Sequence, residues 1–212
     1  MGTASRGLLD AVVQLLRHGG REGASIAGIA TGIPPAMDDT TPAWASLIRE
    51  VPDFPSPGIL FRDMMPLLAD RAGFAAMLAD LAAPWREAGI QAVAGVESRG
   101  FILGAALARE LDAGFVPLRK PGKLPGELFE ESYALEYGSD RLQVQANAVR
   151  AGERVLLVDD VLATGGTLAA AARLLQRLGV ELVGGAVLME LEGLGGRARW
   201  PAEVPLLALL RH

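Results

Sequence analysis

The chain of 212 residues contains no cysteine, which excludes disulfide frameworks, thiolate metal sites and cysteine nucleophiles. A sequence without cysteine suits a reducing compartment, so we expect a cytoplasmic protein. Histidine is almost as scarce: His18 and His212 stand apart near the two ends and form no metal-binding or acid–base constellation. Candidate functional residues therefore belong to other residue types.

Aromatic residues, long apolar runs and excess positive charge are also lacking. The three tryptophans, Trp44, Trp85 and Trp200, are scattered, which favours packing roles over a stacking platform. No stretch approaches the roughly 18 uncharged apolar residues that a membrane span requires. The formal net charge is -5, whereas duplex binders usually carry a basic face. We therefore expect neither a membrane nor a nucleic acid as partner.

Residues 1–40 differ in composition and hydrophobic pattern from the rest of the chain. Apolar residues at helical spacing in residues 4–16 are followed by a segment rich in glycine and proline. The apolar part is short and contains Asp10, so it does not indicate a secretory signal. Three arginines and four acidic residues argue against a DNA-binding arm. We predict an N-terminal extension over 1–40, part helical and part flexible, and one globular domain over 41–212.

Strand and helix patterns alternate in the second part of the chain. Apolar patterning predicts strands at 92–96, 115–118, 154–158 and 182–190, and helices at 64–81, 101–110 and 168–178. Prolines, glycines and charges predict a mobile loop over 119–131, and residues 133–137 and 142–146 predict a hairpin. This order is typical of an α/β fold with a mainly parallel central sheet and helices on both faces.

Residues 155–167 carry the strongest functional signal. An apolar strand ends in Asp159 and Asp160, and a small-residue turn then leads into an alanine-rich helix, for which Thr167 is the predicted N-cap. The turn and the helix start are formed by Ala163, Thr164, Gly165, Gly166 and Thr167. Glycines let backbone N–H groups converge on an anion, and the helix N-terminus adds partial positive charge. The segment therefore predicts a phosphate-binding site.

Two carboxylates beside a phosphate would repel it unless they accept hydrogen bonds from hydroxyls. Asp159 and Asp160 therefore indicate a ribose diol with a nearby divalent cation. An ideal strand places neighbouring residues on opposite faces, so the two acids are expected to have different tasks. The alternative is a helix capped by Thr167 with solvated acids beside it, but the strand, acids, glycines and threonine together favour the phosphate site. Neither a Walker sequence nor a G-x-G-x-x-G segment after a strand occurs in the chain.

Residues 155–167 resemble the phosphoribosyl-diphosphate motif of type I phosphoribosyltransferases. Four further segments are similar, in order, to signatures of the adenine branch of that family: residues 53–63, 95–101, 119–126 and 132–138. The match covers about 48–212 and says nothing of 1–40. It implies transfer of 5-phosphoribosyl from phosphoribosyl diphosphate to adenine in purine salvage, giving AMP and pyrophosphate. It also implies Mg²⁺ held mainly by the substrate, a homodimer, a small hood and a mobile loop or hairpin.

Arg99 lies in a turn between a strand and a helix, where it can make charge-assisted bonds to pyrophosphate. The alternative is a surface salt bridge. The resemblance implies a catalytic role for Arg99 and a cis peptide, which we place at Glu97–Ser98.

Three cations, Arg119, Lys120 and Lys123, lie within five residues, which indicates a multiply charged ligand in this acidic protein, although an ordinary solvated loop is the alternative. The resemblance implies that their loop closes over pyrophosphate, sometimes at the neighbouring subunit's site. Strand alternation alone places Glu136 on the solvent face. The resemblance instead implies that Glu136 faces adenine near N7 and assists proton movement, and that Tyr137 donates its hydroxyl to the phosphates.

The resemblance places the base pocket at Leu60, Phe61 and Arg62. Backbone groups near Leu60 would read the adenine edge, and Arg62 would order the site. Leu188 is the candidate for the opposite apolar wall. The alternatives are an ion pair between Arg62 and an acid such as Asp63, and a core position for Leu188.

Two other functions stay open at this point. One is phosphoribosyl transfer to another base, such as xanthine or hypoxanthine. The other is a non-catalytic regulator that senses phosphoribosyl diphosphate and binds DNA through residues 1–40.

Overall fold

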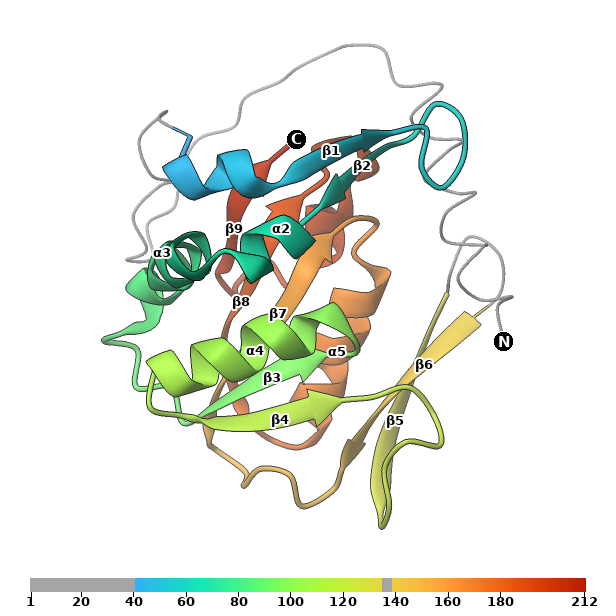
Figure 1. Ribbon diagram of the computed structural model, residues 1–212. Coiled ribbons are helices and arrows are strands. Elements are labelled where there is room, and N and C mark those ends of the chain that lie inside the picture. The colour runs from blue at the N-terminus through green and yellow to red at the C-terminus, as the bar shows by residue number, and fades with distance from the viewer. Residues whose placement is uncertain (1–40, 135–138) are drawn as a thin grey trace.

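The computed structural model describes residues 41–134 and 139–212, in which strands and helices alternate along the chain (Figure 1). The strands are β1 (Arg49–Pro52), β2 (Leu60–Asp63), β3 (Ala92–Val96), β4 (Gly114–Leu118), β5 (Leu128–Ala134), β6 (Ser139–Gln145), β7 (Arg154–Leu162), β8 (Glu181–Glu190) and β9 (Leu206–Arg211). The α-helices are α2 (Met65–Ala69), α3 (Arg71–Ala82), α4 (Arg99–Glu110) and α5 (Gly166–Arg177). Short 3-10 segments are η1 (Ala43–Leu47), η2 (Ala83–Trp85), η3 (Glu192–Leu194) and η4 (Gly196–Arg199).

A five-stranded sheet in the order β4-β3-β7-β8-β9 forms the centre of the fold. Every neighbouring pair in it is parallel, which confirms the predicted mainly parallel sheet. All five residues of β3 are buried, as expected for an apolar run in a sheet covered on both faces. The carboxyl ends of β3 and β7 therefore lie at one edge of the sheet, where α/β proteins bind ligands.

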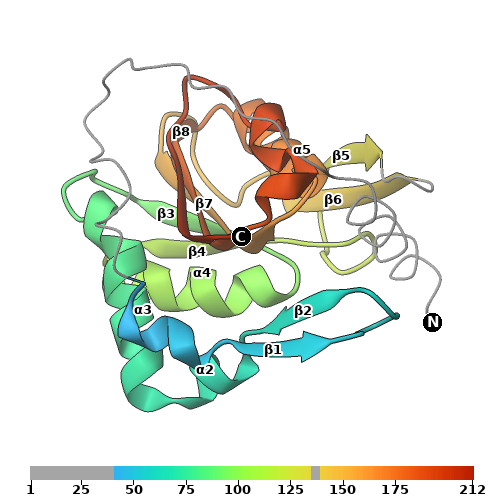
Figure 2. The ribbon, with the colours of Figure 1, turned by 90° about the horizontal axis from the view of Figure 1, so that it is seen from above.

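Helices cover both faces of this sheet (Figure 2). Helix α5 lies on one face together with the β5–β6 hairpin, and α3 and α4 lie on the other. Successive residues of β7 alternate between the two layers: Val155 and Leu157 belong to one buried cluster, and Leu156 and Val158 to the other. This packing on both sides fixes the position of the carboxyl end of β7.

A small antiparallel pair, β1–β2, corresponds to the predicted hood. Its register joins Arg49 to Asp63 and Pro52 to Leu60. In Figures 1 and 2 the pair lies beside α2 and outside the central sheet. The sequence patterns did not predict β1, β2 or β9, because the first two are only four residues long and lack clear alternation.

The predicted helix over 64–81 is wrong in one respect, because the chain forms two helices there. Asp70 adopts an extended conformation between α2 and α3, and its side chain accepts a hydrogen bond from the N–H of Gly73 at 2.7 Å. This is an N-cap bond, which satisfies a free donor at the start of α3. The cap interrupts an apolar pattern that otherwise reads as one helix.

The predicted loop over 119–131 is partly wrong, because β5 begins at Leu128. Strand β5 pairs with β6 from Leu128 opposite Gln145 to Ala134 opposite Ser139, so the hairpin itself is confirmed with different bounds. Its turn, residues 135–138, and the whole of residues 1–40 lie outside the described residues. The predictions for Glu136, Tyr137 and the extension therefore lie there as well. Within the described parts of the chain, no helix combines the length and apolarity needed to cross a bilayer.

Candidate active site

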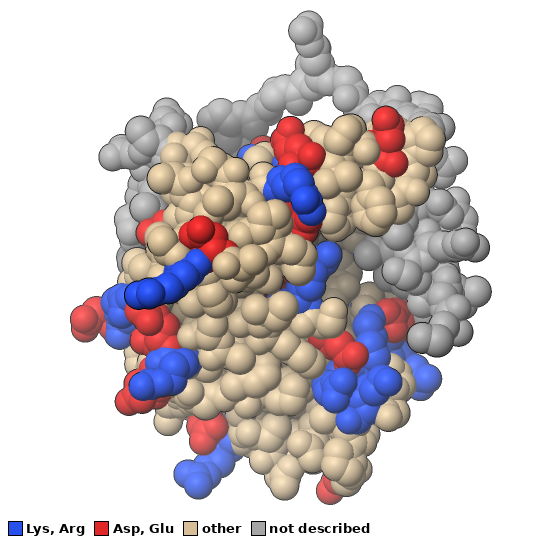
Figure 3. All heavy atoms as spheres, in the orientation of Figure 1, with Lys and Arg blue, Asp and Glu red and all other residues tan. Residues whose placement is uncertain are grey.

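A cleft of about 830 Å³ opens at the carboxyl ends of β3 and β7. Its border includes Leu60, Phe61 and Arg62 of β2, Arg99, Lys120, Asp159, Asp160, and Ala163, Thr164, Gly165, Gly166 and Thr167. Segments that are far apart in the sequence thus meet around one hollow. On the face shown in Figure 3, basic and acidic side chains lie next to one another, so positive charge is local rather than spread over the surface.

The small-residue turn leads directly into α5, as predicted, but Thr167 is not its N-cap. The N-cap is Gly165, which has a φ of 77°, and no side chain caps the helix. Glycine adopts this left-handed conformation without the steric cost that a Cβ would bring. The first N–H groups of α5 therefore face the cleft without a capping side chain, as an anion-binding helix N-terminus requires.

Asp159 and Asp160 both border the cleft, whereas an ideal strand would separate them. Strand β3 pairs with β7 only as far as Val158. The last part of β7 therefore has no β3 neighbour, and the cleft reaches both faces of β7 there. The two acids still differ in their surroundings. Asp160 lies 2.5 Å from Arg99 Nε, and Asp159 accepts the N–H of Asp160 at 2.9 Å.

The surroundings of Asp159 perturb its pKa strongly. Burial, and then the negative charge of Asp160, raise the pKa of Asp159 well above its usual value near 3.8. A Cβ on Gly100 would lie 2.9 Å from Asp159 Oδ1, so α4 packs directly against this side chain. A buried carboxylate without a cationic partner of its own is suited to hydroxyl donors from a ligand.

The turn between β3 and α4 brings Arg99 to the cleft. The Glu97–Ser98 peptide is cis, as the resemblance implied. Glu97 accepts hydrogen bonds from Arg119 Nε at 3.1 Å and from the N–H of Lys120 at 3.0 Å. Burial acts to raise the pKa of Glu97, but these two hydrogen bonds and the positive charges of Arg119 and Lys123 together lower it. Glu97 thereby fixes the start of the predicted cationic loop.

Of the three predicted loop cations, only Lys120 borders the cleft. Its Nζ donates to Tyr133 Oη at 3.0 Å and contacts Asp140. Burial acts to lower the pKa of Lys120, whereas the bonds to Asp140 and Tyr133 raise it and prevail. Arg119 instead pairs with Glu97 and lies over the Phe101 ring, 5.7 Å from its centroid. Lys123 does not border the cleft in this conformation.

The base end of the cleft lies at the hood. Arg62 lies 3.6 Å from Glu50, and its buried Nε has no hydrogen-bond partner among the described residues. Leu188 does not form the opposite wall, because it is fully buried in the core. The next residue along β8, Met189, borders the cleft instead, together with Leu191 beyond the strand. The prediction chose the wrong residue of the strand, since neighbouring residues face different sides.

Three residues of this site were missed by sequence reasoning. Glu97, Tyr133 and Asp140 all border the cleft and hold the cationic loop through Arg119 and Lys120. Glu97 lies in segment 95–101, which is similar to a family signature, so the sequence did contain a signal that could have identified it. Asp140 carried no local signal, because its contact with Lys120 depends on the fold of the hairpin.

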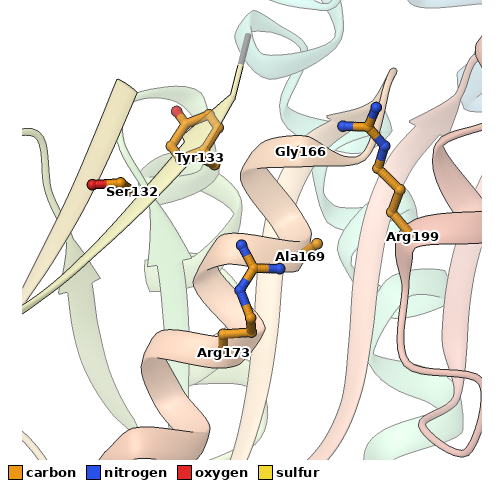
Figure 4. Close-up of a pocket in the computed structure, with 6 residues that line it drawn as sticks. All are labelled: Ser132, Tyr133, Gly166, Ala169, Arg173 and Arg199. Carbon is orange, nitrogen blue, oxygen red and sulfur yellow. The ribbon is translucent and has the colours of Figure 1, made fainter. Parts of the chain in front are cut away.

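A second, smaller hollow of about 390 Å³ adjoins the first at Tyr133 and Gly166 (Figure 4). Figure 4 shows Arg173 on α5 and Arg199 on the segment beside the start of that helix. Arg173 Nε is paired with Glu131 at 2.7 Å. The start of α5 therefore borders a second hollow, which is lined mainly by polar side chains.

Comparison with known proteins agrees with this geometry. The model of the family described as "Phosphoribosyl transferase domain" matches residues 68–202. The adenine phosphoribosyltransferase of Xanthomonas axonopodis pv. citri is 58% identical over 169 residues, which cover 80% of this chain and 91% of the relative. That of a Synechococcus species is 58% identical over 161 residues, 76% of this chain and 92% of the relative.

Solved structures give the same result. The adenine phosphoribosyltransferase of Rhodothermus marinus has a TM-score of 0.74 and 51% identity, and covers 79% of this chain and 95% of its own. The Saccharomyces cerevisiae enzyme, solved with adenine and an imino-altritol bisphosphate, has a TM-score of 0.74 and 41% identity over 79% of this chain and 99% of its own. The chain therefore belongs to the phosphoribosyl transferase family and, within it, to the adenine phosphoribosyltransferases.

Proposed function

We infer that this chain transfers the 5-phosphoribosyl group of phosphoribosyl diphosphate to adenine, which gives AMP and pyrophosphate and serves purine salvage. The observation that carries this inference is the junction of β7 and α5. There an uncapped helix N-terminus, a glycine turn and two carboxylates border one cleft. In the reaction a bond forms between N9 of adenine and the anomeric carbon, the bond from that carbon to diphosphate breaks, and N9 loses its proton.

The turn and the acids would hold the sugar phosphate. The 5-phosphate would accept hydrogen bonds from the N–H groups of the turn and from the hydroxyls of Thr164 and Thr167. The ribose diol would donate to Asp159 and Asp160, which border the same cleft. These contacts fix the anomeric carbon in place, so much of the catalysis is positioning.

Cationic side chains would meet the leaving diphosphate. Arg99 and Lys120 border the cleft, and each is paired with an acid in the free protein, Arg99 with Asp160 and Lys120 with Asp140. Negative charge grows on the diphosphate as its bond breaks, and such cations stabilise it. We assign Arg119, Lys123 and Tyr137 to the same task after the loop closes, which would also exclude water from the reacting carbon.

The hood would hold adenine. Leu60, Phe61 and Arg62 border the cleft from β2, and Met189 lies on its border as well. We assign recognition of the adenine edge to backbone groups near Leu60, and proton movement at the base to Glu136. Both assignments follow from the family resemblance.

The donor set fits Mg²⁺ held mainly by the substrate. Among the described residues there is no group of three His, Cys, Asp or Glu side chains that could hold a metal ion. Asp159 and Asp160 nevertheless supply hard oxygen ligands, which Mg²⁺ prefers, next to the expected position of the ribose. When bound, the ion would neutralise charge on the diphosphate. We further propose a homodimer and a cytoplasmic location, and assign the activity to residues 41–212.

Incorporation of radiolabelled adenine tests this function. The purified chain with phosphoribosyl diphosphate and Mg²⁺ is expected to convert adenine to AMP, and a panel with hypoxanthine, guanine and xanthine is expected to react at least 100-fold more slowly. Equal rates with another base would refute the adenine assignment. No nucleotide product with any base would refute the transferase.

A further inference from the structure

The loop from Ala163 to Gly166, the proposed phosphate-binding loop, is contacted by a turn that lies outside residues 155–167. We call residues 195–199, between β8 and β9, the supporting turn. Gly195 has a φ of 63°, and Gly196 is buried. Figure 4 shows Arg199, the last residue of this turn, beside Gly166 at the start of α5. The two segments are thus neighbours in space, although some 30 residues separate them in the sequence.

The supporting turn and the phosphate-binding loop touch backbone to backbone. A Cβ added to Gly196 would overlap the carbonyl oxygen of Ala163 and would lie 2.8 Å from the N–H nitrogen of Gly165. A Cβ added to Gly165 would in turn overlap the carbonyl oxygen of Gly196. Real Cβ atoms do not approach backbone atoms so closely, so either addition would force the two segments apart. The position of one segment therefore fixes the position of the other.

An ion pair between the buried Glu190 and the partly exposed Arg197 holds the supporting turn in place. Glu190, the last residue of β8, is only 4% exposed. Arg197 Nε lies 2.9 Å and 3.0 Å from the two carboxylate oxygens of Glu190, and Arg197 Nη2 lies 2.5 Å from one of them. Arg197 Nη1 also donates to the carbonyl oxygen of Leu206 at 3.0 Å. Forked, charge-assisted contacts of this kind specify one geometry.

We propose that Glu190 and Arg197 are positioning residues for the 5-phosphate site. They anchor the supporting turn to β8 and β9, and Gly196 then holds the loop from Ala163 to Gly166 in the shape that binds phosphate. Neither side chain borders the cleft, so their effect passes through the turn. The inference rests on the proposed function, because it assumes that this loop binds the sugar 5-phosphate.

Two matched pairs of variants test the proposal. Gly196→Ala is compared with Gly193→Ala, because a Cβ at Gly193 meets nothing within 4 Å. Glu190→Gln is compared with Glu192→Gln, an exposed carboxylate on the same segment. Calorimetry measures the Kd of each protein for ribose 5-phosphate and for pyrophosphate. Pyrophosphate reports on the cations Arg99 and Lys120, whose ion pairs are with Asp160 and Asp140 rather than with residues of the supporting turn.

We expect Gly196→Ala and Glu190→Gln to weaken ribose 5-phosphate binding at least tenfold and to change pyrophosphate binding less than twofold. Gly193→Ala and Glu192→Gln should leave both Kd values within twofold of the parent. A change under fivefold for ribose 5-phosphate, or equal weakening of both ligands, would overturn the proposal. Circular dichroism shows whether each variant folds. If Gly196→Ala does not fold, the Kd values of Glu190→Gln are judged by the same limits. If Glu190→Gln does not fold either, those of Arg197→Lys are used. AMP formation by the parent chain is measured separately, so failure of the proposed function is seen independently.

Discussion

At the scale of single residues, Asp159 combines a cost to stability with the role in binding that we propose for it. Its pKa is raised by burial and by Asp160, so ionisation of this carboxyl is less favourable in the folded protein than in the unfolded chain. Below pH 3.8, the usual pKa of this carboxyl in an unfolded chain, the group makes its full contribution to the free energy of unfolding. This contribution is lost as the pH rises through the higher pKa of the folded state. Asp159→Asn removes the ionisation but keeps the oxygen that accepts the N–H of Asp160.

We predict that Asp159→Asn raises the melting temperature at pH 8 and that this gain shrinks toward pH 4. The same variant should lower kcat/KM for phosphoribosyl diphosphate by two orders of magnitude or more, because the ribose diol loses a charged acceptor. Scanning calorimetry from pH 4 to pH 8 and steady-state kinetics measure the two effects. The exposed Glu203→Gln serves as control and should change neither. A gain that is independent of pH would contradict the assignment of the raised pKa.

At the scale of elements, helices α3 and α5 begin in different ways. Helix α3 begins with a side-chain cap from Asp70 to the N–H of Gly73. Helix α5 begins at a glycine without such a cap, and its first turn borders the cleft. A side-chain cap stabilises a helix but occupies the donors that an anion would use.

Substitution of one polar residue at each helix start tests this contrast. Asp70→Ala should cost about 1 kcal/mol of folding free energy, the usual loss of an N-cap, and leave KM for phosphoribosyl diphosphate unchanged. Thr167→Ala removes no cap bond, so the unfolding midpoint in urea should stay within error of the parent. Its KM for phosphoribosyl diphosphate should rise about tenfold, because one hydroxyl donor to the phosphate is lost. A destabilised Thr167→Ala protein with normal KM would show that Thr167 serves the helix after all.

The same elements show how much could be predicted from the sequence. Strands β3 and β7 were found because a strand buried on both faces is a continuous apolar run, and that pattern is local. The break at Asp70 was missed because one capping bond, rather than the apolar pattern, divides the two helices. The site was predicted where chemistry and spacing coincide in one segment, as in residues 159–167. It was missed where the partners meet only in three dimensions, as Lys120 does with Asp140 and Gly165 with Gly196.

At the scale of the whole molecule, we propose that residues 41–212 contain the parts needed for the reaction. The described residues that border the cleft fall between Ile59 and Leu191. The described core begins at Trp44, which is buried and donates its Nε1–H to Asp80 at 2.6 Å. The chain from residue 41 onward should therefore fold and act without the extension.

We predict that a chain beginning at residue 41 keeps kcat and both KM values within twofold of the parent and melts within a few degrees of it. A chain that begins at residue 49 is the matched comparison. It lacks Trp44, and loss of a buried aromatic side chain typically costs about 3–5 kcal/mol, so its melting temperature should fall sharply. Circular dichroism establishes the fold of both proteins before AMP formation is measured. A truncation at residue 41 that is well folded but inactive would mean that residues 1–40 complete the active site, and the boundary proposed here would then have to move.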